Sequence, residues 1–156
     1  MNKKFIKKGL ILIVSGLLIG GGVVFYMINK PHRDVQAADI DFEITSDQLV
    51  TEYLSDRQAA NTKYLQEEGE SKILAIEGVI ASMDVDMKKQ KVLLLKSADA
   101  KAGVSCTFTE STNSHADNLK TGDKVTIKGI IRSGAGYDED LEMYEDVIVE
   151  KCDMLN

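Results

Sequence analysis

Tryptophan is absent from this sequence of 156 residues, and proline, histidine and cysteine are scarce, with one, two and two residues. Two cysteines are too few for the disulfide framework that supports many small secreted domains with weak cores. The histidines, His32 and His115, have no His-x-x-x-His spacing, and the cysteines have no Cys-x-x-Cys spacing, so the patterns of a zinc site and of a redox motif are both missing. We expect no metal, no cofactor and no catalytic residue, and we expect His115 to be a solvated surface residue.

Positive charge is scarce in most of the chain. Six of the 19 basic residues and none of the 25 acidic residues fall in the first 33 positions, which leaves 13 basic against 25 acidic residues, a net charge of −12, for the rest. Binding to nucleic acid normally depends on Lys and Arg side chains that neutralise several phosphates. The acidity therefore disfavours nucleic acid as a partner.

A long uncharged run lies close to the amino terminus. Residues 9–28 contain no charged side chain, and a helix of 20 residues spans about 30 Å, the thickness of the hydrocarbon core of a membrane. Four lysines precede the run, and basic residues flanking a membrane span favour the cytoplasmic side. We predict a cytoplasmic basic tail over residues 1–8, a transmembrane helix over residues 9–28, and a cell-membrane protein that crosses once, with its carboxyl-terminal domain extracytoplasmic.

A cleaved signal peptide is the alternative, because Val35-Gln36-Ala37 has the small-residue character of a cleavage site. The apolar run is longer than the usual 7–15 residues of a signal peptide's apolar region, and the candidate site lies well beyond the end of the run. These two features favour an uncleaved anchor. No cysteine lies between residues 20 and 40, so the sequence offers no site there for a lipid-modified amino terminus. We assign residues 29–45 to a linker.

The rest of the chain changes from a helical to a strand-like pattern. Thr45 and Ser46 offer amino-terminal caps, and apolar residues recur on one helical face from Leu49 to Leu65, so we expect one amphipathic helix that packs on a core. Five segments rich in Val, Ile, Leu and Thr follow, with turn residues between them. They are residues 72–83, 91–97, 104–109, 124–133 and roughly 141–153.

Details of the strand segments indicate an OB-fold, a small five-stranded Greek-key β-barrel. The first segment is long and contains Gly78, where a bulge or bend would let one strand serve two faces of the barrel. The stretch between the third and fourth segments is longer than a hairpin needs, and Ser111 to Ser114 can cap a short helix there. The predicted class is α+β, with a transmembrane helix followed by residues 46–156 as an amphipathic helix and an OB-fold-like Greek-key barrel.

Residues 46 to 154 resemble the tRNA_anti-like family of OB-fold domains. The resemblance lies in a helix that leads into Ile73–Gly78, then Val104–Phe108, then the turn and strand of Leu119–Gly129, and a late Cys152. The pattern Gly-Asp-x-Val-x-Ile-x-Gly within the third motif is shared by many OB-folds. The resemblance implies a bacterial envelope protein behind a membrane or lipid anchor.

The implied fold also makes Cys106 and Cys152 neighbours, because the third and fifth strands of the barrel are adjacent. The two sulfur atoms could form a disulfide if the side chains face each other, and such a bond would persist outside the cytoplasm. Two reduced, buried cysteines are the alternative. Both readings remain open at the level of sequence.

OB-folds commonly bind ligands on the outer face of the second and third strands and at the loops beside it. The ligand-binding residues predicted on this basis are Lys91, Leu93, Ser105, Thr107 and Tyr137. The second strand has no aromatic residue, which disfavours the stacking used by single-strand nucleic-acid binders.

We therefore expect a noncatalytic, membrane-anchored binding or scaffold module of the cell envelope. Its expected partners are the membrane and an unknown envelope protein or oligosaccharide. Nucleic-acid or oligosaccharide binding through the OB face is the alternative. An enzyme or redox protein is disfavoured because no nucleophile and base are paired in the sequence. An acidic run, Asp138 to Glu142, could hold a cation weakly, although a solvated surface is the usual fate of such runs.

Overall fold

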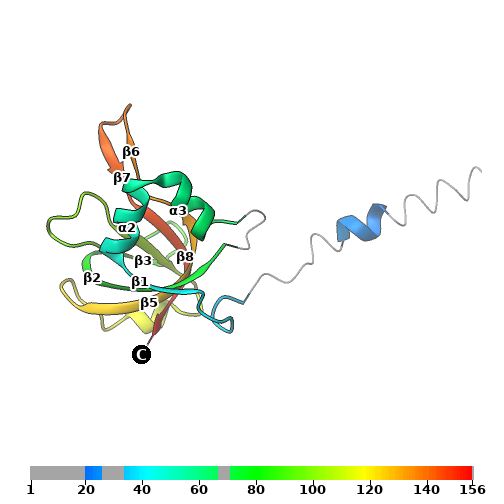
Figure 1. Cartoon of the computed structure of the whole chain (residues 1–156). Helices are drawn as coiled ribbons and strands as arrows, with labels where there is room; N and C mark the ends of the chain where they lie inside the picture. The colour runs from blue at the N-terminus through cyan, green and yellow to red at the C-terminus, as the bar shows by residue number, and fades with distance from the viewer. Residues whose placement is uncertain (1–19, 26–33, 67–70, 156) are drawn as a thin grey trace, which may run out of the picture. The chain divides into compact units, whose positions relative to one another are not determined.

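The computed structural model describes residues 20–25, 34–66 and 71–155 (Figure 1). The chain divides into two units, residues 1–33 and 34–156, and each is described by itself. In the first unit, residues 20–25 are helical and exposed. No helix among the described residues is long and apolar enough to cross a membrane. Most of the predicted span, residues 9–28, lies outside the described residues.

The second unit is built on a closed five-stranded β-barrel. The strands are paired in the order β2, β3, β4, β8 and β5, and β5 pairs back onto β2 to close the ring. The β4–β8 pair is parallel and the other four pairs are antiparallel. The barrel strands are β2 (Ile73–Val85), β3 (Lys91–Leu95), β4 (Val104–Phe108), β5 (Lys124–Ser133) and β8 (Val147–Leu155). The predicted α+β class with a five-stranded barrel is confirmed.

Strand β2 serves two partners, as its length suggested. Its first half pairs with β5 and its second half with β3, and the register shifts between Ile80 and Ser82. The irregularity therefore lies just beyond Gly78 rather than at it. A Cβ atom on Gly78 would lie 2.8 Å from Ser46 Oγ and 3.0 Å from Leu95 Cβ. The glycine is thus needed for close packing of β3 and of the helix that begins at Ser46 against the strand.

The predicted single helix is two helices, α2 (Ser46–Ser55) and α3 (Arg57–Tyr64). Asp56 between them has an extended backbone, and its carboxylate accepts a hydrogen bond from Ala59 N at 2.9 Å. Asp56 therefore ends one helix and caps the next, which is a common use of aspartate. The prediction of one helix was wrong, but the predicted packing face is correct because Leu49, Tyr53 and Tyr64 are buried.

Part of the predicted linker is folded onto the barrel. Phe42–Thr45 form strand β1, which pairs in parallel with the start of β2. The ammonium group of Lys128, which is only 7% exposed, donates hydrogen bonds to the carbonyl oxygens of Gln36 and Ala38. The linker assignment for residues 34–45 was therefore wrong. The sequence pattern did not reveal this four-residue strand, because the strand is ordered by its contacts with β2.

Two smaller elements lie in the connections. The short helix expected after residue 110 is a single 3₁₀ turn, η2 (Asn113–Ala116). The polar stretch between the fourth and fifth barrel strands forms a hairpin of β6 (Gly136–Asp138) and β7 (Met143–Glu145). This hairpin projects from the barrel beside α2 and α3 (Figure 1). Residues of this hairpin line the candidate site.

Candidate ligand-binding site

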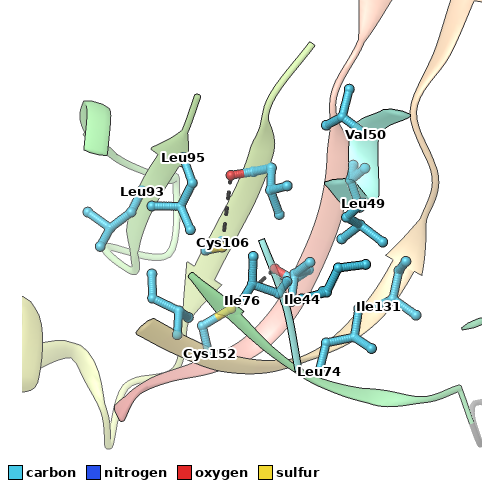
Figure 2. Close-up of a cluster of buried hydrophobic side chains, with 14 of the residues drawn as sticks. Ile44, Leu49, Val50, Leu74, Ile76, Leu93, Leu95, Cys106, Ile131 and Cys152 are labelled. Atoms are coloured by element: carbon cyan, nitrogen blue, oxygen red, sulfur yellow. Dashed lines mark hydrogen bonds between the residues drawn. The ribbon is translucent and has the colours of Figure 1, made fainter. Parts of the chain in front are cut away.

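Strands β3 and β4 form the outer OB face that the sequence predicted as a binding surface. Leu93 pairs with Cys106, and both side chains are fully buried in the hydrophobic core (Figure 2). Directly paired residues of an antiparallel ladder point to the same side, so Leu93 accompanies Cys106 inward. The placement of Leu93 on the outer face is therefore corrected, because period-two alternation alone did not fix which residues of β3 face out.

The remaining predicted residues of this face are half-buried and partly engaged. Ser105 pairs with Leu94 and Thr107 pairs with Val92, so each hydroxyl-bearing residue of β4 lies opposite an aliphatic residue of β3. The ammonium group of Lys91 is paired with the carboxylate of Asp117, close to η2. This face therefore presents no aromatic platform and little free positive charge.

Tyr137, the fifth predicted residue, lies apart from these four on the β6–β7 hairpin. It is 50% exposed and pairs across the hairpin with Tyr144. The two ring centroids are 4.9 Å apart, and the ring planes are tilted by 56°. Tyr144 was not predicted, because only the hairpin register brings these two tyrosines together.

A cleft of about 450 Å³ opens between this hairpin, the helices and the loop from β3 to β4. We call it the tyrosine cleft. Three tyrosines and two cationic residues line it, together with one leucine and one glycine. The lining residues are Tyr53, Leu54, Arg57, Lys101, Gly136, Tyr137 and Tyr144.

The two cations of the tyrosine cleft make only weak interactions with other side chains of the protein. Arg57 lies 4.0 Å from the carboxylate of Glu145, and both side chains are more than half exposed, so the pair contributes at most about 1 kcal/mol. The guanidinium passes close to Gly136, where a Cβ atom would come within 2.7 Å of it. The Lys101 ammonium lies 5.4 Å from the centroid of the Tyr144 ring. Both positive charges remain available to a ligand.

Tyr53 forms a buried wall of the tyrosine cleft. Its side chain is 1% exposed, and its hydroxyl group has no hydrogen-bond partner among the described residues. Burial, assisted by the nearby Tyr64, raises the pKa of Tyr53 from 10.0 to about 12. The phenol is therefore neutral at physiological pH and can donate a hydrogen bond. An unsatisfied buried hydroxyl costs about 1–3 kcal/mol, so a native example requires an explanation.

Tyr64 provides an internal comparison with Tyr53. Its side chain is also buried, and the two ring centroids are 6.1 Å apart. The Tyr64 hydroxyl donates a hydrogen bond of 2.8 Å to Glu52, whose carboxylate also binds Lys63 at 2.8 Å. The hydrogen bond from Lys63 is the main cause that lowers the pKa of Glu52. Of these two neighbouring phenols, only the one that lines the cleft lacks a partner.

The two cysteines are brought together in the core, on the neighbouring strands β4 and β8. Both are fully buried free thiols. Burial, and then the hydrogen bond with Cys106, raise the pKa of the Cys152 thiol. The Cys152 thiol is therefore protonated, and both thiols are shielded from solvent. A bond between them stays a prediction.

The acidic run on the hairpin serves local structure. One carboxylate oxygen of Asp138 accepts hydrogen bonds from the backbone N–H groups of Asp140 and Leu141, at 2.9 and 3.0 Å. Within residues 20–25, 34–66 and 71–155, no three His, Cys, Asp or Glu residues are grouped so that they could hold a metal ion. His115 is about half exposed and lies 2.6 Å from Asp153.

The sequence pattern of one family, tRNA_anti-like, matches residues 1–141. The chain belongs to the tRNA_anti-like family. A search of curated proteins finds no match to this family member.

Solved structures resemble this tRNA_anti-like chain at low sequence identity. One is a lipoprotein of Klebsiella pneumoniae, provisionally named as nucleic acid-binding, which is 14% identical with a TM-score of 0.54. The match covers 81% of this chain and 99% of the lipoprotein, and it shows a shared fold.

Two weaker matches concern parts of larger proteins. The Schizosaccharomyces pombe Stn1–Ten1 complex is 19% identical, with a TM-score of 0.37 and coverage of 54% of this chain and 58% of the other. Asparaginyl-tRNA synthetase of Pyrococcus horikoshii is 19% identical, with a TM-score of 0.36 and coverage of 59% and 21%.

Proposed function

We propose that this protein is a noncatalytic, membrane-anchored OB-fold module of the bacterial cell envelope that binds its ligand in the tyrosine cleft. One observation supports the choice of site above the others. The cleft is lined by Tyr53, whose buried hydroxyl has no partner among the described residues, and by two cations, the exposed Tyr137 and the half-buried Tyr144. A bound ligand would supply the missing hydrogen bond.

The chemistry of the lining residues favours binding over catalysis. The lining includes no His, Cys, Ser, Asp or Glu, so it offers no pair of nucleophile and general base. Arg57 and Lys101 supply positive charge, and the tyrosines supply flat, amphipathic surfaces. Such groups hold and orient a ligand.

The proposed anchor rests on the amino-terminal sequence. The uncharged run over residues 9–28 has the length of a membrane-spanning helix, and the four lysines before it favour a cytoplasmic amino terminus. The barrel would then face the extracytoplasmic side.

Fractionation of cells that express the full chain tests the anchor. We expect the protein to stay in the membrane pellet after alkaline carbonate extraction, and protease added to cells with an opened outer layer should digest the barrel. Recovery as a freely soluble protein, or protection of the barrel from the protease, would overturn this part of the proposal.

A photo-crosslinking residue placed at Tyr137 tests the site in the same membranes. Val85, on the β2–β3 hairpin, is a matched control, because it is 56% exposed against 50% for Tyr137. We expect an adduct from position 137 and none from position 85. Equal adducts, or none from either position, would argue against the tyrosine cleft as the binding site.

Oligonucleotide binding is the second candidate function. Two cations beside two tyrosines are the kinds of group that bind single strands, although the net charge of −12 beyond residue 33 opposes a polyanion. An affinity for single-stranded DNA that falls steeply with salt would favour this candidate.

A further inference from the structure

We propose that the tyrosine cleft recognises a sugar ring that carries one anionic group, either a carboxylate or a phosphate. This inference rests on the proposed function and adds the class of ligand. It is drawn from three features of the cleft: the contrast between local and overall charge, the phenol groups, and the missing partner of Tyr53.

The distribution of charge around the cleft favours a small anion over a polyanion. Arg57 and Lys101 place two positive charges at the cleft, whereas the chain beyond residue 33 has a net charge of −12. The hairpin beside the cleft adds the acidic run from Asp138 to Glu142. A compact single anion can approach these cations, whereas an extended polyanion would also meet the carboxylate of Glu145 and the acidic run. The arrangement thus favours one charged group over a phosphate backbone.

Phenol groups suit a polyhydroxylated ring. Tyr137 and Tyr144 line the cleft, and their hydroxyls can both donate and accept a hydrogen bond, as a sugar hydroxyl does. The half-exposed ring of Tyr137 also offers a flat apolar surface on which the C–H face of a sugar can pack. The cleft volume, about 450 Å³, falls in the range of about 300–1,000 Å³ typical of small-ligand sites.

The Tyr53 hydroxyl is itself buried, so a ligand oxygen reaches it only if the wall of the cleft shifts. It is held at the buried end of its side chain and has no partner among the described residues. A ligand oxygen that accepts its proton would satisfy it, and a charged acceptor would form the stronger bond. The anionic group or a neighbouring hydroxyl of the sugar can play this part.

Tyrosine fluorescence of the full chain in detergent micelles gives a direct binding assay. The protein has no tryptophan, and three of its five tyrosines line the cleft. The probes are a glucuronate-containing disaccharide, N-acetylglucosamine 6-phosphate, the neutral disaccharide of N-acetylglucosamine, inorganic phosphate and a 12-nucleotide single-stranded DNA. We expect at least one anionic sugar to bind about tenfold more tightly than the neutral sugar and than phosphate alone. The tighter of the two anionic sugars identifies the carboxylate or the phosphate as the recognised group.

Two variants and one control assign the binding to the cleft. Arg57→Gln should remove the preference for the anionic sugars, and Tyr53→Phe should weaken their binding about fivefold to tenfold. Arg132→Gln is the matched control, because Arg132 is an exposed arginine on β5 outside the cleft, and its affinity should be unchanged. Circular dichroism of each variant checks that the barrel is folded.

Several outcomes would overturn the inference. Equal affinity for neutral and anionic sugars, tighter binding of the DNA, or an equal loss in Arg132→Gln would each exclude a specific anionic-sugar site. Absence of binding by every probe, together with an adduct from position 137, would reject the ligand class and leave the proposed site intact. Absence of both binding and adduct would reject the site as well.

Discussion

The two buried tyrosines allow a sharp test of the unpartnered hydroxyl. Tyr53 of α2 and Tyr64 of α3 lie side by side, but only the Tyr64 hydroxyl has a partner, Glu52. Replacing either tyrosine with phenylalanine removes one oxygen atom and leaves the ring. The two substitutions should therefore change the free energy of unfolding in opposite directions.

The expected magnitudes follow from the environments. Tyr53→Phe removes an unsatisfied buried hydroxyl, whose burial costs about 1–3 kcal/mol, so we expect the protein to gain about 1 kcal/mol. Tyr64→Phe removes a hydrogen bond to a carboxylate, which contributes about 1.5–3 kcal/mol when well buried. The Glu52 side chain is 29% exposed, which lowers this to about 1 kcal/mol. The variants should differ by about 2 kcal/mol.

Thermal unfolding of the full chain in detergent, followed by far-ultraviolet circular dichroism, measures the difference. A change of 1 kcal/mol corresponds to about 4 °C in the thermal midpoint for a domain of this size. We expect the midpoint of Tyr53→Phe to rise and that of Tyr64→Phe to fall. A Tyr53→Phe variant as unstable as Tyr64→Phe would show that the Tyr53 hydroxyl is already bonded within the protein, and the argument for a ligand contact would fail.

Three further predictions concern the same region and the core. The pKa of Tyr53 is about 12 in the folded protein, against 10.0 in the unfolded chain. The stabilisation from the neutral phenol is therefore complete below pH 10 and is lost as the pH rises toward 12. The free energy of unfolding should fall by roughly 3 kcal/mol over this range. Unfolding measured from pH 9 to 12 should show this loss in the native chain and a shallower one in Tyr53→Phe; identical profiles would contradict it. Gly134→Ala should cost at least about 1–3 kcal/mol in thermal unfolding, because the new Cβ would lie 1.9 Å from the Tyr53 ring; unchanged stability would show that the ring can move away. Cys106 and Cys152 are buried free thiols in the structure, so both should react with a maleimide once denaturant is added, whereas labelling only when denaturant and reductant are added together would show a disulfide.

Much of the barrel could be predicted from sequence, because buried strands have a recognisable local pattern of alternating apolar residues bounded by turns. Lys124–Ser133 was predicted with the bounds that the structure has, since its alternation and the preceding Gly-Asp turn are both local. The long first strand that serves two faces of the barrel was also predicted, although its irregularity lies beyond Gly78, between Ile80 and Ser82.

The errors arose where distant contacts decide local structure. Leu93 faces inward because of its register with Cys106, and a run of three leucines cannot reveal which of them faces out. Asp56 reads as an ordinary helix residue until its side chain is seen to cap α3. Strand β1 is ordered by its pairing with β2, which the sequence pattern does not display.

The candidate site was the least predictable part. Tyr137 was named from the sequence, but its cleft partners come from α2, α3, the β3–β4 loop and β7. These residues are far apart in the chain and have no shared motif. The missing hydrogen bond of Tyr53 is a property of the assembled structure, so no sequence pattern could indicate it.

The most direct test of the tyrosine cleft is nuclear magnetic resonance of the full chain, labelled with ¹³C at the ζ carbon of tyrosine and titrated with a soluble digest of envelope glycans. The Tyr53, Tyr137 and Tyr144 resonances should move together along one saturation curve, while the Tyr64 resonance stays in place. If no tyrosine resonance moves, or if Tyr64 moves as far as the three cleft tyrosines, the cleft is not the binding site.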